Sequence, residues 1–192
     1  MGSTTVEIRS PRLLLRCWRS TDLTPFAELN ADPVVMEHFP APLSRDESDA
    51  LADRISDGLE SRGWGLWAVE VTDAERPASF IGFVGLSTAD FDAHFTPAIE
   101  IGWRLDRRHW GQGYATEAAR AVVTWARGNL ETEEIVSFTT TTNGPSQAVM
   151  RRLGMSHDPG EDFDHPRVDP QSRLCRHVLY RLRLKDWDRP GG

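Results

Sequence analysis

The segment from residue 99 to 122, which reads IEIGWRLDRRHWGQGYATEAARAV, constrains the fold more than any other part of this sequence. Its first half is rich in β-branched and aromatic residues and predicts a strand over residues 98–105. Its second half predicts a helix over residues 113–128, because small apolar side chains recur there at the spacing of one helical face. These side chains are Ala115, Ala118, Ala119, Val122, Val123 and Ala126. A strand that enters a helix through two glycines, Gly111 and Gly113, requires a fold in which strands and helices are mixed.

Strand and helix patterns also follow one another along the rest of the chain. Strand patterns cover residues 6–18, where Pro11 can interrupt the strand, and residues 66–72, 80–87, 135–142 and 177–184. Helical patterns begin near residue 23, at Ser44 and at Pro145, and Ser44 forms a capping-box pattern with Glu47. Residues 88–97 and 160–172 are predicted loops. This order predicts a single α/β domain of the mixed α+β kind over residues 1–192, with an antiparallel meander at its centre.

Composition and charge exclude several classes of protein. The chain has 22 basic and 29 acidic residues, a net charge of −7, which argues against nucleic-acid binding driven by phosphate neutralisation. No apolar run approaches the roughly 20 residues that span a bilayer, and the N-terminus lacks the apolar core of a signal peptide. Cys17 and Cys175 are too few for a disulfide framework and are expected to be buried thiols. We therefore expect a cytoplasmic protein that binds neither nucleic acid nor membrane.

The turn before the alanine-rich helix has the features of an anion site. In the run from Arg108 to Gly113 the glycines allow close approach of the backbone, and free N–H groups at the helix start point toward the same place. Arg107 and Arg108 add positive charge. The alternative is a plain strand-to-helix turn. The sequence lacks the Gly-Lys-Ser/Thr of a P-loop and the third glycine of a dinucleotide fingerprint, so neither motif explains this turn.

A second strand-to-helix corner contains polar side chains. Asn143 follows a predicted strand, and Ser146 lies three residues later near the start of a predicted helix. Both side chains can face a ligand at this corner. Alternatively, Asn143 starts a turn and Ser146 only caps the helix.

Taken together, these motifs resemble the GNAT acyltransferase superfamily. R-x-x-G-x-G is followed by YATEA, and N-G-P-S-x-x-x-x-R-R-L-G-M follows some thirty residues later. The start, SPRLLLRCW, and the end, RHVLYRLRL, resemble the RimJ/RimL branch, which acetylates protein N-terminal amines and related substrates. The resemblance implies the GNAT fold: a twisted, mostly antiparallel sheet, splayed at the cofactor site and flanked by about four helices. It also implies that acetyl-CoA donates an acetyl group to a primary amine by direct attack while both are bound.

The resemblance further implies which residues bind the cofactor. The strand over residues 99–105 matches the one that accepts the pantetheine arm, the glycine turn matches the pyrophosphate loop, and Asn143 and Ser146 match the polar pair beside the thioester. Met155 departs from the family, in which Phe commonly stands at this position, and this changes packing rather than chemistry. The expected cofactor-binding residues are Trp103, Leu105, Arg107, Arg108, Gly111, Gln112, Gly113, Tyr114, Ala115, Thr116, Asn143 and Ser146.

Two residues are candidates for the catalytic groups. Glu100 shares a strand face with Gly102 and Arg104, opposite a face of apolar residues, and a carboxylate there would take a proton from the attacking amine. The alternative is a solvent-facing Glu100 paired with an arginine. Ser146 would donate to the departing thiolate. Since the chain has only two tyrosines, Tyr114 and Tyr180, a tyrosine acid is the less favoured option.

The acceptor is not defined by the sequence. Glu37, His38, Trp67 and Asp92 lie in regions that surround the acceptor in the family, and carboxylates there would suit a cationic amine. A protein N-terminus, a polyamine, an amino acid and an antibiotic amine all remain possible, as do a succinyl donor and a monomer or a homodimer. Asp162, Asp164 and His165 lack zinc-ligand spacing, so we expect no metal. A catalytically silent coenzyme A-binding module on the same fold is the main alternative function.

Overall fold

The sheet is mixed and its strands are almost all antiparallel. The computed structural model describes residues 6–72 and 79–187. Within these residues the strands are β1 (Ile8–Arg9), β2 (Leu13–Arg16), β3 (Leu66–Val71), β4 (Ser79–Ala89), β5 (Ala98–Leu105), β6 (Glu134–Thr140), β7 (Ser156–His157), β8 (Phe163–Asp164) and β9 (Arg176–Arg183). Their order across the sheet is β1-β2-β3-β4-β5-β6-β9-β7, and β8 also pairs with β9.

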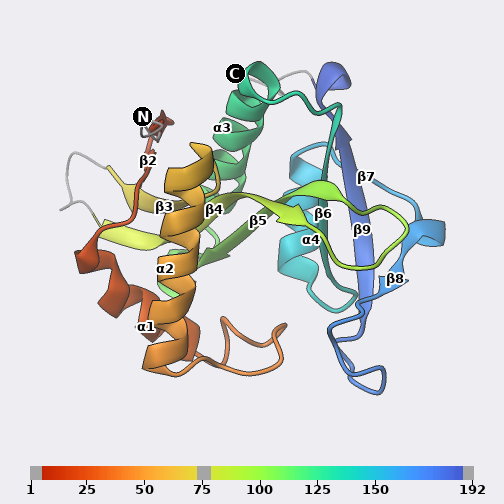
Figure 1. The fold of residues 1–192 in the computed structure, drawn as a ribbon, viewed down its shortest axis with the longest axis horizontal. Coiled ribbons are helices and arrows are strands. Elements are labelled where there is room, and N and C mark those ends of the chain that lie inside the picture. Colours follow the sequence, from red (N-terminus) through yellow and green to blue (C-terminus); the bar gives the residue numbers. More distant parts are fainter. Residues whose placement is uncertain (1–5, 73–78, 188–192) are drawn as a thin grey trace.

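Strands β5 and β6 form the parallel pair of this sheet, and they separate almost at once. Their pairing is confined to Glu100 and Val136, whereas β5 pairs with β4 along its whole length. In Figure 1, β3 to β5 run across the molecule while β6 and β9 run steeply at the right, so the sheet changes direction between β5 and β6. The predicted splay of the sheet is confirmed, and it opens a gap beside the second half of β5.

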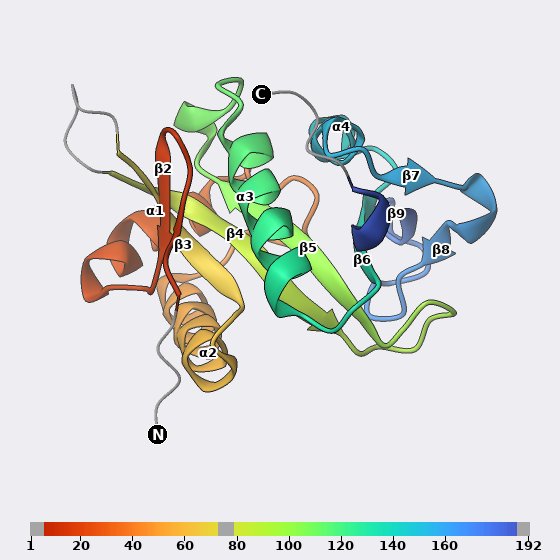
Figure 2. The ribbon, with the colours of Figure 1, turned by 90° about the horizontal axis from the view of Figure 1, so that it is seen from above.

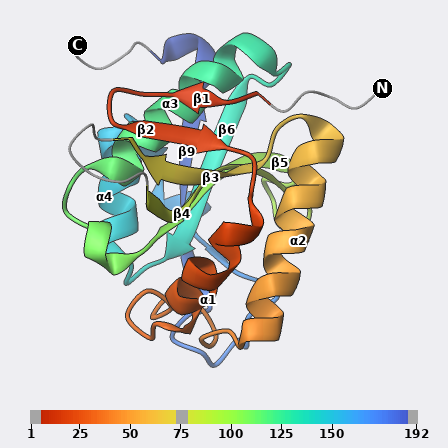
Figure 3. The same cartoon turned by 90° about the vertical axis from the view of Figure 1, so that its left-hand side faces the viewer.

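Helices cover both faces of the first part of the sheet (Figures 2 and 3). The helices are α1 (Leu23–Ala31), α2 (Arg45–Arg62), α3 (Tyr114–Asn129) and α4 (Gly144–Arg152). The alanine-rich face of α3 packs in the main core with β-strand residues such as Leu15, Val69 and Ile101. On the other face, α1 and α2 bury Phe26 and Ile55 against Phe83. The two faces of β5 therefore look toward different helices.

Several local predictions are confirmed by the structure. The side chain of Ser44 accepts from the Glu47 N–H at 3.2 Å and the Glu47 carboxylate accepts from the Ser44 N–H at 2.8 Å, so the capping box is present. The first strand is interrupted near Pro11 and forms β1 and β2.

None of the helices in the two described ranges combines the length and apolar character needed to cross a bilayer.

Two local predictions are wrong. The segment 160–172, which was expected to be a loop, contains the short strand β8, and β7 lies just before it. Each is a two-residue strand that pairs with β9. Strands this short carry no detectable hydrophobic period. Cys175 is buried as expected, but Cys17 is only half-buried.

Candidate active site

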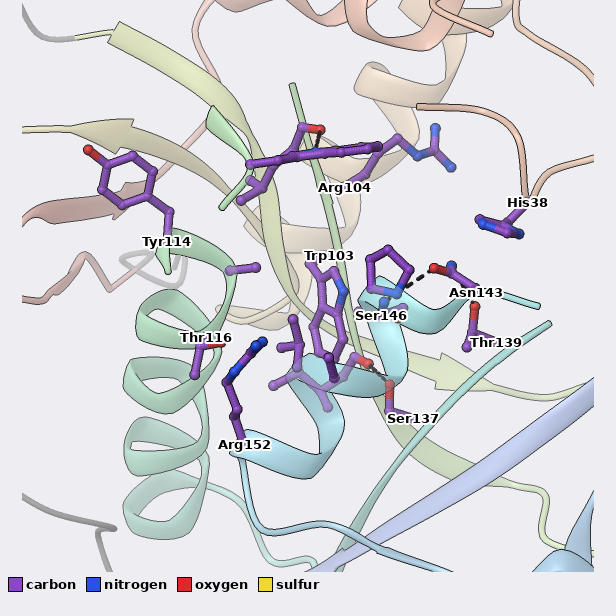
Figure 4. A pocket seen from close by; sticks show the side chains of 18 of the residues that line it. His38, Trp103, Arg104, Tyr114, Thr116, Ser137, Thr139, Asn143, Ser146 and Arg152 are labelled. Carbon is purple, nitrogen blue, oxygen red and sulfur yellow. Dashed lines mark hydrogen bonds between the residues drawn. The ribbon is translucent and has the colours of Figure 1, made fainter. Parts of the chain in front are cut away.

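A large cavity of about 1780 Å³ lies where β5 and β6 separate. One side chain bridges the strands at the start of the gap: the Ser137 hydroxyl donates to the Ile101 carbonyl at 2.9 Å. Beyond this bridge the cavity is bounded by the rest of β5, the start of α3 and the start of α4 (Figure 4). An unpaired strand edge presents N–H and C=O groups to whatever lies beside it. This edge is therefore able to bind an extended chain that carries amide groups.

One end of the cavity is formed by the glycine turn and the first turn of α3. Gly111 and Gly113 have φ angles of 75° and 81°, in the left-handed region that favours glycine. Gly113 is the N-cap of α3 and provides no side-chain acceptor, so the first N–H groups of the helix are free to bind an anion. The backbone and side chains of Tyr114, Ala115 and Thr116 line the cavity here. This geometry fits a phosphate or pyrophosphate.

The arginines at this end differ from those predicted. Arg107 pairs with Asp32 at 2.7 Å, and Arg108 pairs with Asp106 through its side chain. Both line a separate small pocket of about 240 Å³, and neither lines the large cavity. The side chains of Arg107 and Arg108 therefore form local ion pairs and do not supply the positive charge predicted at the anion site.

Gln112 is also turned to a local partner, since its side chain donates to the Arg108 carbonyl at 3.3 Å. Arg120 and Arg152 line the cavity instead. Arg120 donates to the Arg152 carbonyl at 3.1 Å, while its Nε is buried and has no partner among the described residues. Arg120 lies four residues after Thr116 on the same helical face, a spacing that was available in the sequence.

The middle of the cavity contains the strand-to-helix corner before α4. Asn143 is the N-cap of α4: its side-chain oxygen accepts from the Ser146 N–H at 3.2 Å, and its amide donates to the Thr139 hydroxyl at 2.9 Å. The Ser146 side chain lines the cavity, and no side-chain partner for its hydroxyl exists among the described residues. The alternative in which Ser146 caps the helix is therefore wrong, because Asn143 has that role.

Along β5, the predicted cofactor residues Trp103 and Leu105 lie on the same face and both line the cavity. Trp103 is half-buried and is seen in Figure 4. Leu105 is buried, and its carbonyl already accepts from the Trp110 indole at 2.8 Å. Of the two residues, Trp103 thus offers the larger surface to a ligand.

Glu100 lies on the other face of β5, at the point where the strands separate. It is half-buried, lines the cavity, and accepts a hydrogen bond from the Ser87 hydroxyl at 3.2 Å. Burial raises the pKa of Glu100 from 4.5 to about 7, and the bond from Ser87 offsets this only in part. No arginine, lysine or histidine forms an ion pair with it in the described part of the chain. A carboxylate with a pKa near neutrality can both accept and release a proton at physiological pH.

Four residues were predicted around the acceptor, and the structure brings two of them to the cavity. His38 and Glu37 line it, and a ring nitrogen of His38 lies 3.1 Å from the Thr140 hydroxyl. Burial lowers the pKa of His38 below its ordinary value. Glu37 is exposed at the rim.

The other two predicted acceptor residues lie elsewhere. Trp67 is 0% exposed in the main core, where its indole donates to the Val6 carbonyl, so the prediction that it binds a substrate is wrong. Asp92 is exposed on the β4–β5 loop and does not line the cavity.

The residues considered as an alternative general acid or as metal ligands form other interactions. Tyr180 is buried and accepts from Arg151 at 3.2 Å, outside the cavity lining. Asp162 bonds His157 at 2.8 Å, and Asp164 pairs with Arg176. No cluster of three metal-ligating side chains occurs among the residues that the structure describes.

Several side chains that line the cavity were not predicted as site residues. They are Phe39, Arg104, Arg120, Thr139, Arg152, His165 and His177. Arg104 and Arg120 had a visible signal, because Arg104 shares a strand face with Glu100 and Arg120 shares a helical face with Thr116.

Comparisons with known proteins show the family to which the chain belongs. The family model for the acetyltransferase (GNAT) domain matches residues 12–156, so the chain belongs to the GNAT acetyltransferase family. It is 33% identical over 168 residues to the FsC-acetyl coenzyme A-N(2)-transacetylase of Aspergillus fumigatus, covering 83% of this chain and 68% of that protein.

Solved structures share the fold over almost the whole chain. An acetyltransferase from Agrobacterium tumefaciens superposes with a TM-score of 0.73 at 26% identity, covering 93% of this chain and 95% of that one. RimJ of Mycobacterium smegmatis, solved in complex with a CoA-disulfide, superposes with a TM-score of 0.72 at 13% identity, covering 98% and 92%. The predicted GNAT fold is confirmed, with the RimJ/RimL type among its structural neighbours.

Proposed function

We propose that this protein is an N-acetyltransferase that moves the acetyl group of acetyl-CoA to a primary amine while both are bound. The observation that carries the proposal is Glu100: an unpaired carboxylate with a pKa of about 7, on the wall of the cavity where β5 and β6 separate. GNAT acetyltransferases use acetyl-CoA, and the Aspergillus relative is named for transfer to a nitrogen. Both facts support an amine as acceptor.

The residues of the cavity fit coenzyme A. The free N–H groups at the start of α3 suit its pyrophosphate, and the unpartnered Nε of Arg120 is a further donor for an anion. The open edge of β5 beside Trp103 suits the amides of the pantetheine arm. Acetyl-CoA would supply the activated acetyl thioester at the Asn143–Ser146 corner.

Each catalytic group has a task that its surroundings permit. Glu100 takes the proton that the acceptor ammonium must lose before it attacks, directly or through a water molecule. Ser146 has a free hydroxyl and donates a hydrogen bond to the leaving thiolate. Asn143 is a positioning residue, because its two hydrogen bonds fix the start of α4 and therefore Ser146. Holding the amine against the thioester supplies much of the remaining rate.

A non-catalytic coenzyme A-binding module would show the same anion site but would gain nothing from Glu100. A half-buried carboxylate without a charged partner costs stability, a cost that only a functional role would offset in selection. The presence of Glu100 therefore favours the enzyme.

The test is thiol release from acetyl-CoA in the presence of amines, with a thermal shift as the control for binding. The panel contains a peptide with a free N-terminal serine, spermidine and an amino acid. We expect amine-dependent thiol release that Glu100→Gln reduces by roughly ten- to ten-thousand-fold, with the acetyl-CoA thermal shift retained. A thermal shift without amine-dependent thiol release from any acceptor would identify a binding module, and no thermal shift would contradict coenzyme A binding.

A further inference from the structure

The face of β5 that carries Glu100 also carries a second half-buried charged residue, Arg104. The two side chains and Gly102 alternate with the residues that face α3, so Arg104 lies on the α1–α2 side of the cavity. In Figure 4 the Arg104 side chain extends toward the side of the cavity where His38 lies. Arg104 is thus part of the wall that an acceptor would meet, rather than the wall next to α3.

The guanidinium of Arg104 has no carboxylate partner in the described part of the chain. Its Nη1 donates at 2.7 Å to the side-chain oxygen of Asn30, a neutral amide. Its Nε is buried and has no hydrogen-bond partner. The rings of Phe39 and Phe83 lie 4.1 Å and 5.5 Å from it, which covers the face of the guanidinium and leaves the donors at its edge. Burial without a compensating anion lowers the pKa of Arg104 to about 10.

Arg181 shows how the Nε and Nη2 groups of an arginine in this protein bind a carboxylate. Its Nε and Nη2 each donate to one oxygen of Glu161 at 2.8 Å, a two-pronged pairing of guanidinium and carboxylate. Asn30 holds Arg104 through Nη1 and leaves the Nε–Nη2 edge unused. That edge matches a carboxylate in geometry and in charge.

We propose that the acceptor is an amine that also carries a carboxylate, and that Arg104 binds this carboxylate while Glu100 receives the proton of the amine. The proposal rests on the proposed N-acetyltransferase function and names its substrate class. The carboxylate can belong to a free amino acid or to an acidic residue of a peptide, because both present the same group to Arg104. Polyamines are disfavoured, since a second ammonium group would meet the buried cation.

The substrate preference is measured with pairs of acceptors that differ only in the carboxylate. Glycine, β-alanine and 4-aminobutyrate are compared with their primary amides, and a Ser-Asp-Ala peptide is compared with Ser-Asn-Ala, both with amidated C-termini. Rates are expressed per protonated amine, the form whose proton Glu100 accepts. We expect at least one acid to exceed its amide in kcat/KM by roughly ten- to a hundredfold, the range for a hydrogen bond to a charged group. The pair that shows the preference distinguishes the free amino acid from the peptide.

Two variants then test Arg104 itself. Arg104→Met removes the guanidinium at similar length, and Asn30→Asp supplies an internal carboxylate to the same guanidinium with almost no change of shape. Each variant should reduce the acid-to-amide ratio to within about threefold of one, mainly through KM of the acid. Asn30→Asp keeps the test decisive if Arg104→Met folds poorly. Arg167→Gln is the control, because Arg167 also lines the cavity but already pairs with Asp90 at 3.1 Å.

The outcomes separate this inference from the proposed function. Amides that react as well as acids would overturn the inference and leave the N-acetyltransferase intact, as would an equal loss of preference in Arg167→Gln. If no amine releases thiol, the proposed function fails, and calorimetric titration of the same acids into protein with coenzyme A still tests Arg104. Binding of an acid that is lost in Asn30→Asp would support the carboxylate site, and no Arg104-dependent binding would overturn it.

Discussion

Two arginines of this protein, Arg16 buried and Arg104 half-buried, have opposite surroundings. Arg16, on β2, is 3% exposed and donates to both oxygens of Asp22 at 2.7 and 2.9 Å and to Glu70 at 2.8 Å. Arg104, on β5, has a neutral amide and two aromatic rings. Although burial acts against its charge, the two carboxylates raise the pKa of Arg16, whereas burial lowers that of Arg104.

The difference distinguishes charges that are paired inside the protein from charges that have no charged partner. Around Arg16 the positive and negative groups compensate one another inside the protein. In the cavity, Glu100 and Arg104 share a strand face, yet neither is paired with a charged side chain of the described residues. Half-buried charge without a charged partner costs stability, and its position on one wall of the cavity supports the roles proposed for these two residues.

The largest expected effect is on stability when the paired arginine is removed. Arg16→Met leaves Asp22 and Glu70 buried with only Arg19 nearby, and breaking such a cluster costs about 3–5 kcal/mol. Arg104→Met leaves no carboxylate unpaired, but the buried Asn30 side-chain oxygen loses its donor, so the cost should be smaller, about 1–3 kcal/mol. Urea unfolding of both variants measures the contrast. Equal losses would show that Arg104 is as structural as Arg16.

The next largest effect concerns Glu100, whose replacement should raise the free energy of unfolding rather than lower it. Its pKa is raised from 4.5 to about 7 on folding, so the folded protein favours the protonated form. Glu100 therefore lowers stability progressively between pH 4.5 and 7, and the full penalty applies above pH 7. At pH 8 the free energy of unfolding of Glu100→Gln should exceed that of the parent by up to about 3 kcal/mol, so the variant should unfold at a higher urea concentration. At pH 4 the two proteins should be equally stable. A variant that is less stable at pH 8 would contradict an unpaired carboxylate.

A smaller effect compares two glycines with the same backbone conformation. Gly63 ends α2 with φ 76°, and Gly113 precedes α3 with φ 81°. Alanine at either position should cost about 1–2 kcal/mol of stability, the strain of a left-handed residue. Only Gly113→Ala should also weaken acetyl-CoA binding, measured by calorimetry. Unchanged affinity in a folded Gly113→Ala protein would remove the pyrophosphate from this turn.

The smallest stability effect distinguishes Asn143 from Ser146. Asn143→Ala removes the N-cap of α4 and should cost about 1 kcal/mol and reduce turnover. Ser146→Ala removes a hydroxyl without an internal partner, so stability should change by less than about 0.5 kcal/mol while turnover falls. Melting temperature and turnover are measured on both. A fully active Ser146→Ala protein would exclude Ser146 from catalysis.

The sequence predicted the parts of the fold that depend on local signals. The capping box at Ser44, the apolar stripe of α3 and the glycine turn depend on residues close together in the chain, and each is present. Glu100 was found because strand alternation placed it opposite apolar neighbours. The structure brings it to the cavity as an unpaired, half-buried carboxylate.

Predictions failed where the position of a side chain depends on residues distant in the sequence, or where the strand shows no hydrophobic alternation. In LWAVEV almost every residue is apolar, so alternation could not show that Trp67 faces the core. The charge of Arg107 was assigned to phosphate because its partner, Asp32, lies 75 residues earlier in the chain. Arg104 was given no role, because the absence of a carboxylate around a buried arginine is visible only after folding.

The most direct test of the account is the pH dependence of kcat/KM for acetyl transfer in the parent protein and in Glu100→Gln. With rates expressed per protonated amine, the form whose proton Glu100 accepts, the parent should gain activity as pH rises through about 7 and then level off, since the deprotonated form of Glu100 is the base. Glu100→Gln should lose this limb and its plateau, because its rate follows only the fraction of free amine, and should stay slower than the parent. A variant that keeps both the limb near pH 7 and the parent rate would show that Glu100 is not the base.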